Sequence, residues 1–248
     1  MHRFIVQSGL ERGGEALLSP EEAAHASKVL RLWPGEEIEL MDGAGRLFAA
    51  ELTGVSREAV SARVKEELPG RESEIEVTLL QGLPKAEKMD WVVQKATELG
   101  VARMIPVRME RCVVKLDEKD AQKRRDRLQR IAAEAAKQCG RARTPVVEAA
   151  MDFSRALKEI DPQGLFIMPW EQASGAGIAQ LRREAERPRG VYILIGPEGG
   201  ISPREAGEAM ECGARAVSLG PRILRTETAA IASVAMVMYA WGHLGGTI

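Results

Sequence analysis

The sequence has little of what secreted, disulfide-bonded and membrane-spanning proteins have in abundance. Its 248 residues include three cysteines, Cys112, Cys139 and Cys212, and no Cys-x-x-Cys pair. An odd number of widely spaced thiols argues against a disulfide framework or a structural zinc site and suits a reducing cytosol. The longest apolar stretch, residues 229–242, is too short for a transmembrane helix, and the first residues lack the apolar run of a signal peptide. We therefore expect a cytoplasmic protein with no membrane segment and no metal.

A large excess of charge of one sign is also missing. The chain has 35 Lys and Arg against 36 Asp and Glu, a formal net charge of -1, which predicts no polyanionic partner. The charge is uneven, however: residues 103–143 carry 13 basic and 6 acidic side chains, a net charge of +7. This basic segment is either the solvated face of a helix or a surface for phosphate groups. Arg141 and Arg143 favour the second interpretation, because they follow a helix on a predicted loop before Pro145.

The first seventy residues have the pattern of a small β-barrel. Short strand-like runs at residues 4–6, 38–41, 47–52 and 59–64 are separated by turn-forming residues. One helix is predicted to begin at Ser19, with Pro20 at its first position. Residues 68–74 are polar and contain Pro and Gly, so we expect a linker there. The predicted domains are therefore residues 1–70 and 74–248.

In the second domain, strands and helices alternate. Apolar runs predict strands at residues 75–80, 103–107, 165–168, 191–195 and 216–220, and amphipathic patterns predict helices at 89–99, 119–139 and 227–241. The near-continuous apolar runs are typical of strands buried on both faces. We expect an α/β domain with a mostly parallel sheet.

Two glycine-containing loops follow predicted strands. Residues 195–200 read Ile-Gly-Pro-Glu-Gly-Gly, and Ser202 with Glu205 then forms a capping box that opens a helix. Glycines let backbone N–H groups approach a ligand at the carboxyl end of a parallel strand, although a tight turn explains them equally well. The loop matches neither the phosphate-binding loop of P-loop enzymes nor the dinucleotide fingerprint. The second loop, residues 219–229, precedes a helix for which Thr226 is the predicted cap. With residues 168–171 after a third strand, the loops predict the walls of one pocket.

These paired loops closely resemble the RsmE family, which methylates N3 of uridine in 16S ribosomal RNA and belongs to the SPOUT class. The resemblance covers the whole chain. It includes His2-Arg3-Phe4, the His25 to Arg31 segment and Met41-Asp42-Gly43 in the first domain, and Gln94 to Gly100, Glu110-Arg111 and Glu134 to Arg141 in the second.

The resemblance implies a SPOUT-type, trefoil-knotted α/β methyltransferase domain preceded by a small PUA-like β-barrel. It also implies a homodimer whose active site draws on both chains and whose partner is the small ribosomal subunit. The implied S-adenosylmethionine site consists of Met168, Leu194, Gly196, Glu198, Gly199, Gly200, Leu219, Gly220, Ile223, Leu224, Arg225 and Thr228. The implied RNA contacts are Arg3, Arg31, Arg111, Arg141 and Arg143.

The chemistry of the reaction suggests roles for three charged residues of the two glycine-containing loops. Uridine N3 becomes a nucleophile when its proton leaves, so we expect a proton acceptor near it, together with a cation or amide donors that stabilise the anion. Arg225 is the candidate cation, and Glu198 and Glu227 are the candidate proton acceptors. Acids at helix starts also stabilise free N–H groups, which is the structural alternative for both glutamates. Other functions left open are methylation of another RNA position, RNA binding without catalysis and a nucleotide-dependent α/β enzyme.

Overall fold

The chain folds into two compact units, each with its own sheet and core. The computed structural model describes residues 1–6, 9–56, 59–69, 72–85, 87–114, 118–173, 177–185, 188–242 and 244. Unit 1 comprises Met1–Glu72 and Ala136–Thr144, and unit 2 comprises Ser73–Ala135 and Pro145–Ile248. Part of the linker predicted at residues 68–74 lies outside the described residues. A segment of nine residues far along the chain therefore belongs with the N-terminal unit, which no local sequence pattern indicates.

Unit 1 is built on a five-stranded sheet with the order β1-β3-β4-β5-β2. Only the β1–β3 pair is parallel. Its elements are β1 (His2–Ile5), β2 (Glu15–Leu17), α1 (Pro20–Ala24), the π-helical turn η1 (His25–Val29), β3 (Glu37–Met41), β4 (Leu47–Val55) and β5 (Val60–Leu68). The sheet encloses a core that includes Phe4, Ile38, Leu40 and Leu52. The Ser19 side chain accepts the backbone N–H of Glu22, which confirms the predicted start of α1.

Two polar contacts hold the irregular parts of unit 1. Asp42 Oδ1 accepts the backbone N–H groups of Ala44, Gly45 and Arg46, and Oδ2 accepts the Arg46 guanidinium at 2.7 Å. Burial raises the pKa of Asp42, but the hydrogen bonds from Arg46 and Ala44 lower it by more than burial raises it. The pKa of Asp42 therefore lies below its usual range. In the second contact, Arg141 donates to Glu72 Oε2 at 2.8 Å while only 6% exposed. This ion pair joins Ala136–Thr144 to the first seventy-two residues.

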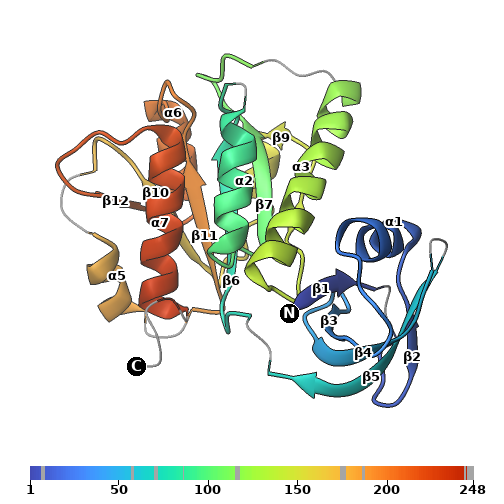
Figure 1. The fold of residues 1–248 in the computed structure, drawn as a ribbon. Helices are drawn as coiled ribbons and strands as arrows, with labels where there is room; N and C mark the ends of the chain where they lie inside the picture. Colours follow the sequence, from blue (N-terminus) through green and yellow to red (C-terminus); the bar gives the residue numbers. More distant parts are fainter. Residues whose placement is uncertain are drawn as a thin grey trace. The chain divides into compact units, whose positions relative to one another are not determined.

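Unit 2 contains a parallel sheet with the order β12-β10-β11-β6-β7-β8, and β9 also pairs with β7 (Figure 1). The strands are β6 (Glu76–Gly82), β7 (Arg103–Arg108), β8 (Val146–Val147), β9 (Met151–Asp152), β10 (Leu165–Pro169), β11 (Gly190–Ile195) and β12 (Arg215–Val217). The predicted α/β class with a parallel sheet is confirmed. Strand order departs from chain order between β6, β11 and β10, so segments far apart in sequence end at the same edge.

Helices cover both faces of this sheet. They are α2 (Lys88–Glu98), α3 (Glu118–Cys139), α4 (Phe153–Leu157), α5 (Ile178–Glu184), α6 (Pro203–Glu211) and α7 (Thr226–Trp241). Residues of α2, α3, α5 and α7 pack with Val77, Leu79 and Ile193 in one core cluster. Residues of α4 and α6 pack with Leu80 and Leu194 in another. Figure 1 shows α2 and α7 side by side on the first face. Neighbouring residues of one strand thus enter different cores, as the alternation of strand side chains requires.

The helix starts of unit 2 test the cap predictions. Ser202 accepts the backbone N–H of Glu205, and the Glu205 carboxylate accepts the Ser202 N–H, so the predicted capping box of α6 is confirmed. The prediction for α7 is wrong. Arg225 is the residue at its cap position, Thr226 is the first helical residue, and no side chain caps the helix. The Thr226 hydroxyl has another partner, described below.

Candidate functional site

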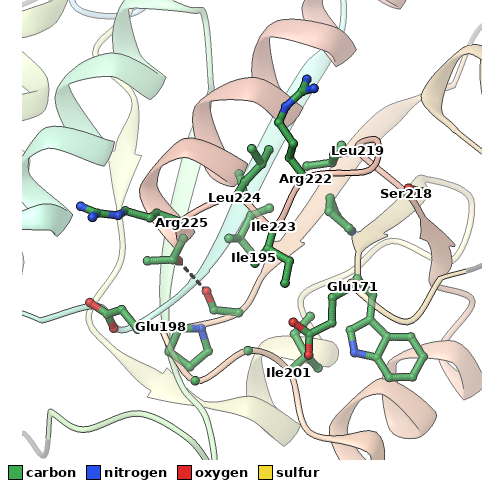
Figure 2. A pocket seen from close by; sticks show the side chains of 18 of the residues that line it. Glu171, Ile195, Glu198, Ile201, Ser218, Leu219, Arg222, Ile223, Leu224 and Arg225 are labelled. Carbon is green, nitrogen blue, oxygen red and sulfur yellow. Dashed lines mark hydrogen bonds between the residues drawn. The ribbon is translucent and has the colours of Figure 1, made fainter.

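Three loops of unit 2 enclose a cavity at the carboxyl edge of the sheet. The loops follow β10, β11 and β12, which are adjacent in the order β12-β10-β11. The cavity has a volume of about 630 Å³ (Figure 2). Its lining consists of Lys88, Pro169, Trp170, Glu171, Ile195, Gly196, Pro197, Glu198, Gly199, Gly200, Ile201, Ser218, Leu219, Gly220, Pro221, Arg222, Ile223, Leu224, Arg225, Thr226 and Ala229. This is the position at which α/β proteins bind small molecules.

A buried hydrogen-bond chain joins the loop after β11 to the start of α7. Thr226 Oγ1 donates to the carbonyl oxygen of Gly196 at 2.5 Å, the bond drawn in Figure 2. The same hydroxyl accepts the side-chain amide of Gln81 at 2.9 Å. Gln81 is fully buried at the end of β6. The chain therefore fixes both glycine-containing loops to the central strand.

Close packing explains the Gly199-Gly200 pair. A Cβ atom on Gly199 would lie 2.8 Å from the Cβ of Arg111 and 3.2 Å from its carbonyl oxygen. Gly200 has a φ of +73°, in the left-handed region that favours glycine. The Arg111 guanidinium donates to the Gly199 carbonyl oxygen at 3.0 Å. The segment around Arg111 thus packs directly against this loop. No residue larger than glycine fits at position 199 unless its neighbours move.

An ion cluster of Lys88, Glu198 and Glu227 includes two residues of the cavity lining, Lys88 and Glu198. The Lys88 ammonium lies 3.1 Å from Glu198 Oε1 and 3.2 Å from Glu227 Oε2. Glu198 Oε1 also accepts the backbone N–H of Lys85 at 3.0 Å. Burial raises the pKa of Glu198, but the backbone N–H groups of Lys85 and Glu198 and the Lys88 ammonium lower it more, so it lies below its usual range. Hydrogen bonding to the Glu198 carboxylate raises the pKa of Lys88, against the effect of burial. Glu198 and Lys88 are therefore both charged at neutral pH.

Nine of the twelve residues predicted for the cofactor site line the cavity. These are Gly196, Glu198, Gly199, Gly200, Leu219, Gly220, Ile223, Leu224 and Arg225. Met168 and Leu194 do not line it: both are fully buried in the core on the α4 and α6 side of the sheet. Their strand neighbours Pro169 and Ile195 take their place, because alternate strand residues face opposite sides. Thr228 is exposed on α7 and is also absent from the lining.

The three predicted catalytic residues differ in position. Arg225 and Glu198 line the cavity, whereas Glu227 does not. The Arg225 guanidinium forms no hydrogen bond or ion pair with any residue the structure describes, and Figure 2 shows it extended from the loop. Glu227 lies in the first turn of α7, where its charge favours the helix, and its carboxylate contacts Lys88.

Several residues of the lining are not among the predicted site residues. Lys88 begins α2, more than a hundred residues before the loops, and only the fold brings it to Glu198. Trp170 packs against a core cluster and also lines the cavity. Glu171 follows β10 and could have been found, since residues 168–171 form the third predicted strand end. Ser218 and Arg222 lie in the second loop.

The predicted RNA-contacting arginines are in different environments. Arg31 is exposed, with a φ of +54°, and Arg111 is exposed beside Gly199. Arg3 forms an ion pair with Glu39. Arg141 is buried and forms an ion pair with Glu72, which leaves little of its side chain accessible to RNA. The backbone N–H of Arg143 donates to the same carboxylate.

Acidic residues neutralise much of the basic segment. Arg103 pairs with Glu148 and Glu159, and further pairs are Arg108–Asp152, Arg125–Asp126, Arg127–Asp90 and Lys137–Glu22. The net charge of +7 therefore overstates the positive surface, because many of its partners come from outside the segment.

The described residues lack two kinds of feature. They contain no group of three or more His, Cys, Asp or Glu side chains placed to hold a metal ion. No described helix is both long and apolar enough to cross a bilayer.

Comparisons with known proteins agree along the whole chain. Residues 71–238 match the family described as RNA methyltransferase domain, and residues 18–65 match the RNA methyltransferase PUA domain. The ribosomal RNA small subunit methyltransferase E of Bacillus subtilis is 35% identical over 99% of each chain. That of Mycobacterium bovis is 31% identical, over 94% of this chain and 90% of the relative.

Solved structures extend the similarity to the fold. A ribosomal RNA small subunit methyltransferase E from Neisseria gonorrhoeae, bound to S-adenosyl methionine, is 34% identical with a TM-score of 0.87, covering 98% of this chain and 99% of that one. A putative methyltransferase from Legionella pneumophila in complex with the same cofactor is also 34% identical, with a TM-score of 0.85 and 98% of each chain covered.

The predicted fold class and family are thereby confirmed. A PUA-like N-terminal domain precedes a methyltransferase domain whose glycine-containing loops surround a cavity at the edge of a parallel sheet. The chain belongs to the RNA methyltransferase family, and its near-full-length relatives are the ribosomal RNA small subunit methyltransferase E enzymes.

Proposed function

We propose that this chain transfers a methyl group from S-adenosylmethionine to N3 of a uridine in the RNA of the small ribosomal subunit. The observation that carries the proposal is the 630 Å³ cavity between the glycine-containing loops. A structure that is 34% identical over nearly the full length is bound to S-adenosyl methionine. Curated relatives at up to 35% identity carry the name of the small-subunit RNA enzyme. The choice of uracil N3 follows the RsmE resemblance.

The residues of the cavity fit this cofactor. Its volume is within the range of small-molecule sites, about 300–1,000 Å³. Ile195, Ile201 and Leu219 offer an apolar wall for an adenine ring, and the glycine-containing loops offer backbone N–H and C=O groups. Glu171 and Glu198 supply negative charge for a ligand that carries cationic groups. When bound, S-adenosylmethionine supplies an electrophilic methyl group on a sulfonium.

The remaining work of the reaction falls to side chains of this chain. Glu198 lines the cavity as a carboxylate and is the proposed acceptor of the N3 proton. Its lowered pKa makes it a weak base, so proton removal depends on stabilising the uracil anion. Arg225, whose guanidinium is free in the described structure, is the proposed cation for one of the carbonyl oxygens beside N3.

We further propose a division of labour between the two parts of the chain. Residues 1–70 form the PUA-like domain that binds RNA, and residues 74–248 form the knotted SPOUT domain that binds the cofactor. Knots are nearly absent from proteins, and the resemblance makes this chain an exception. Arg31 and Arg111 are the first candidates for RNA contacts because both are exposed, and Arg3 and Arg143 are further candidates. Completion of the site by a second chain in a homodimer, and action in the cytoplasm, belong to the same proposal.

The test is mass mapping of small-subunit RNA. Purified small subunits that lack the modification are incubated with the protein and S-adenosylmethionine, and methylated nucleotides are located and identified. We expect methylation at N3 of one uracil. Methyl on ribose, or on a base other than uracil, would overturn the specific reaction while leaving RNA methylation intact.

Two variants test the proposed roles in the same assay. Glu198→Gln and Arg225→Ala should each reduce single-turnover methylation far more than cofactor affinity, measured by calorimetry. Near-normal rates in both variants would exclude these roles for the two side chains.

A further inference from the structure

Lys88 is the one lysine that lines the cavity among the residues the structure describes. It is the first residue of α2, and its side chain is one-third exposed. Both of its carboxylate partners, Glu198 and Glu227, were candidates for the N3 proton. Lys88 is thus a cation held between the proposed proton acceptor and a second carboxylate.

The two carboxylates around Lys88 are not equivalent. Glu198 lines the cavity and can meet a substrate there, whereas Glu227 lies outside the lining. The Glu227 side chain is 17% exposed, and its buried Oε2 atom has the Lys88 ammonium at 3.2 Å as a charged neighbour, without the alignment of a hydrogen bond. If Glu198 takes up a proton, Glu227 therefore still holds Lys88 at the cavity.

We infer that Lys88 is a catalytic residue whose ammonium stabilises the uracil anion, with Glu227 as its positioning residue. The inference rests on the proposed function. Negative charge from N3 spreads to the two flanking carbonyl oxygens. Arg225 is the proposed cation for one of these oxygens, and Lys88 is the proposed cation for the other. Preorganised cations at developing negative charge are among the largest contributions to enzyme rates.

The charges balance without any further reactant. The N3–H bond breaks and its proton goes to the Glu198 carboxylate, which becomes neutral. Lys88 stays protonated and passes from the Glu198 carboxylate to the uracil anion, still paired with Glu227. The N3 electron pair then forms the bond to the methyl carbon, and the electrons of the broken C–S bond remain on sulfur. Glu198 afterwards loses its proton to solvent.

Other charged groups near Lys88 are already occupied. Asp90, on the same helix, forms its ion pair with Arg127 of α3. Lys85 contributes a backbone N–H to Glu198 rather than its ammonium. On the sides of α7 and of the loop after β11, Glu227 and Glu198 are the groups in contact.

The experiment exploits the acidity of the substrate. Small subunits lacking the modification are isolated from cells grown with 5-fluorouracil, so that part of the target position carries fluorouracil, whose N3 proton is more acidic. Methylation at uracil and at fluorouracil is distinguished by mass in one reaction. Lys88→Met should reduce methylation of uracil by about 10²- to 10³-fold, the effect of removing one group that stabilises a transition-state anion. It should also shift the product ratio towards fluorouracil, because the more acidic base needs the cation less.

Two other variants provide the controls. Lys88→Arg keeps the charge and should restore much of the rate and the wild-type product ratio. Lys95→Met removes another lysine of α2, paired with Glu98 at 2.8 Å and absent from the cavity lining, and should leave rate and ratio unchanged. Cofactor binding to each variant is measured by calorimetry.

The outcomes separate the two proposals. If the wild-type chain methylates uracil N3 but Lys88→Met has normal rates, or loses the same factor on both bases, Lys88 is not the anion-stabilising cation. If the wild-type chain methylates no uracil at N3, the proposed function fails and the role of Lys88 fails with it.

Discussion

The hydroxyl of Thr226 donates its hydrogen bond to the carbonyl oxygen of Gly196, thirty residues earlier, at 2.5 Å. Gln81 completes the chain from a third segment by donating to the same hydroxyl at 2.9 Å. Thr226 and Gly196 are also lining residues of the cavity. One buried threonine therefore determines how the two glycine-containing loops are placed relative to β6.

Replacement of this threonine should weaken cofactor binding. Thr226→Val keeps the shape but removes the hydroxyl that accepts one N–H of the Gln81 amide and donates to the Gly196 carbonyl, at a cost of about 1–3 kcal/mol in the free energy of unfolding. We expect the dissociation constant for S-adenosylmethionine to rise about tenfold, which corresponds to about 1.4 kcal/mol. Calorimetry and urea unfolding measure the two effects. Thr226→Ser retains the hydroxyl and should behave like the wild type; equal affinities of the two variants would contradict this role.

The glycine at position 199 should be intolerant of a single methyl group. Gly199→Ala would place a Cβ 2.8 Å from the Cβ of Arg111, and relief of such overpacking typically costs about 1–3 kcal/mol. Displacement of the loop should weaken S-adenosylmethionine binding measured by calorimetry. Gly207→Ala is the matched control, because it lies within α6 with no atom within 4 Å of the added Cβ. It should raise the unfolding temperature and leave affinity unchanged, since alanine is the better helix former.

Arg141 should matter for stability rather than for RNA. Arg141→Met would leave the Glu72 carboxylate without its buried guanidinium, a loss of about 3 kcal/mol for pairs of this kind. Urea unfolding provides the measurement. Arg63→Met removes an exposed arginine 3.8 Å from Glu15 and should have little effect. Unchanged stability of Arg141→Met would return this residue to the set of possible RNA contacts.

Affinity for small-subunit RNA should fall steeply with salt, because bound phosphates release counterions. Arg31→Gln should reduce the slope of log affinity against log salt by about 0.7–0.9, the contribution of one phosphate contact. Filter binding at several salt concentrations measures this slope. Arg215, which is paired with Glu184 at 2.6 Å, is the control: Arg215→Gln should keep the wild-type slope. An affinity that does not change with salt would contradict the proposal that exposed arginines contact RNA phosphates.

Asp42 should make unit 1 sensitive to acid. Its folded pKa lies below the unfolded value of about 3.9, so its stabilisation is present above that pH and is lost as the pH falls through the folded pKa. Unfolding of Asp42→Asn should therefore depend less on pH below about pH 4 than that of the wild type. Asp161→Asn, at an exposed turn, should follow the wild-type curve in denaturant titrations between pH 2.5 and 6. Parallel curves for Asp42→Asn and the wild type would contradict this contribution.

Local patterns predicted the elements well, because their causes are local. Ser202 and Glu205 are three residues apart and must cap a helix together, and the apolar run at 191–195 must be buried on both faces. The same reasoning failed at Thr226, whose hydroxyl serves Gly196 instead of its own helix. Met168 and Leu194, predicted for the cofactor site, have their side chains in the core on the opposite face, since a shift of one residue along a strand moves a side chain to the other side.

Charge behaved differently from pattern. The basic segment has an excess of basic over acidic residues, but much of its positive charge is paired with carboxylates from outside the segment. These carboxylates belong to Glu148, Glu159, Asp152 and Asp90. Arg141 is the clearest case, because its partner Glu72 is sixty-nine residues away and draws the end of α3 into unit 1. Pairing of distant charges depends on the fold, so no sum over a sequence window predicts it.

By itself, the sequence determined the α/β class, the strand ends with their glycine-containing loops and the family, since these depend on residue type and short spacing. Only the tertiary structure decided which side of each strand faces the cavity, which arginines are free and where Lys88 lies. Lys88 and Glu198 are 110 residues apart and meet because the sheet places β11 beside β6, from whose end the chain leads to α2.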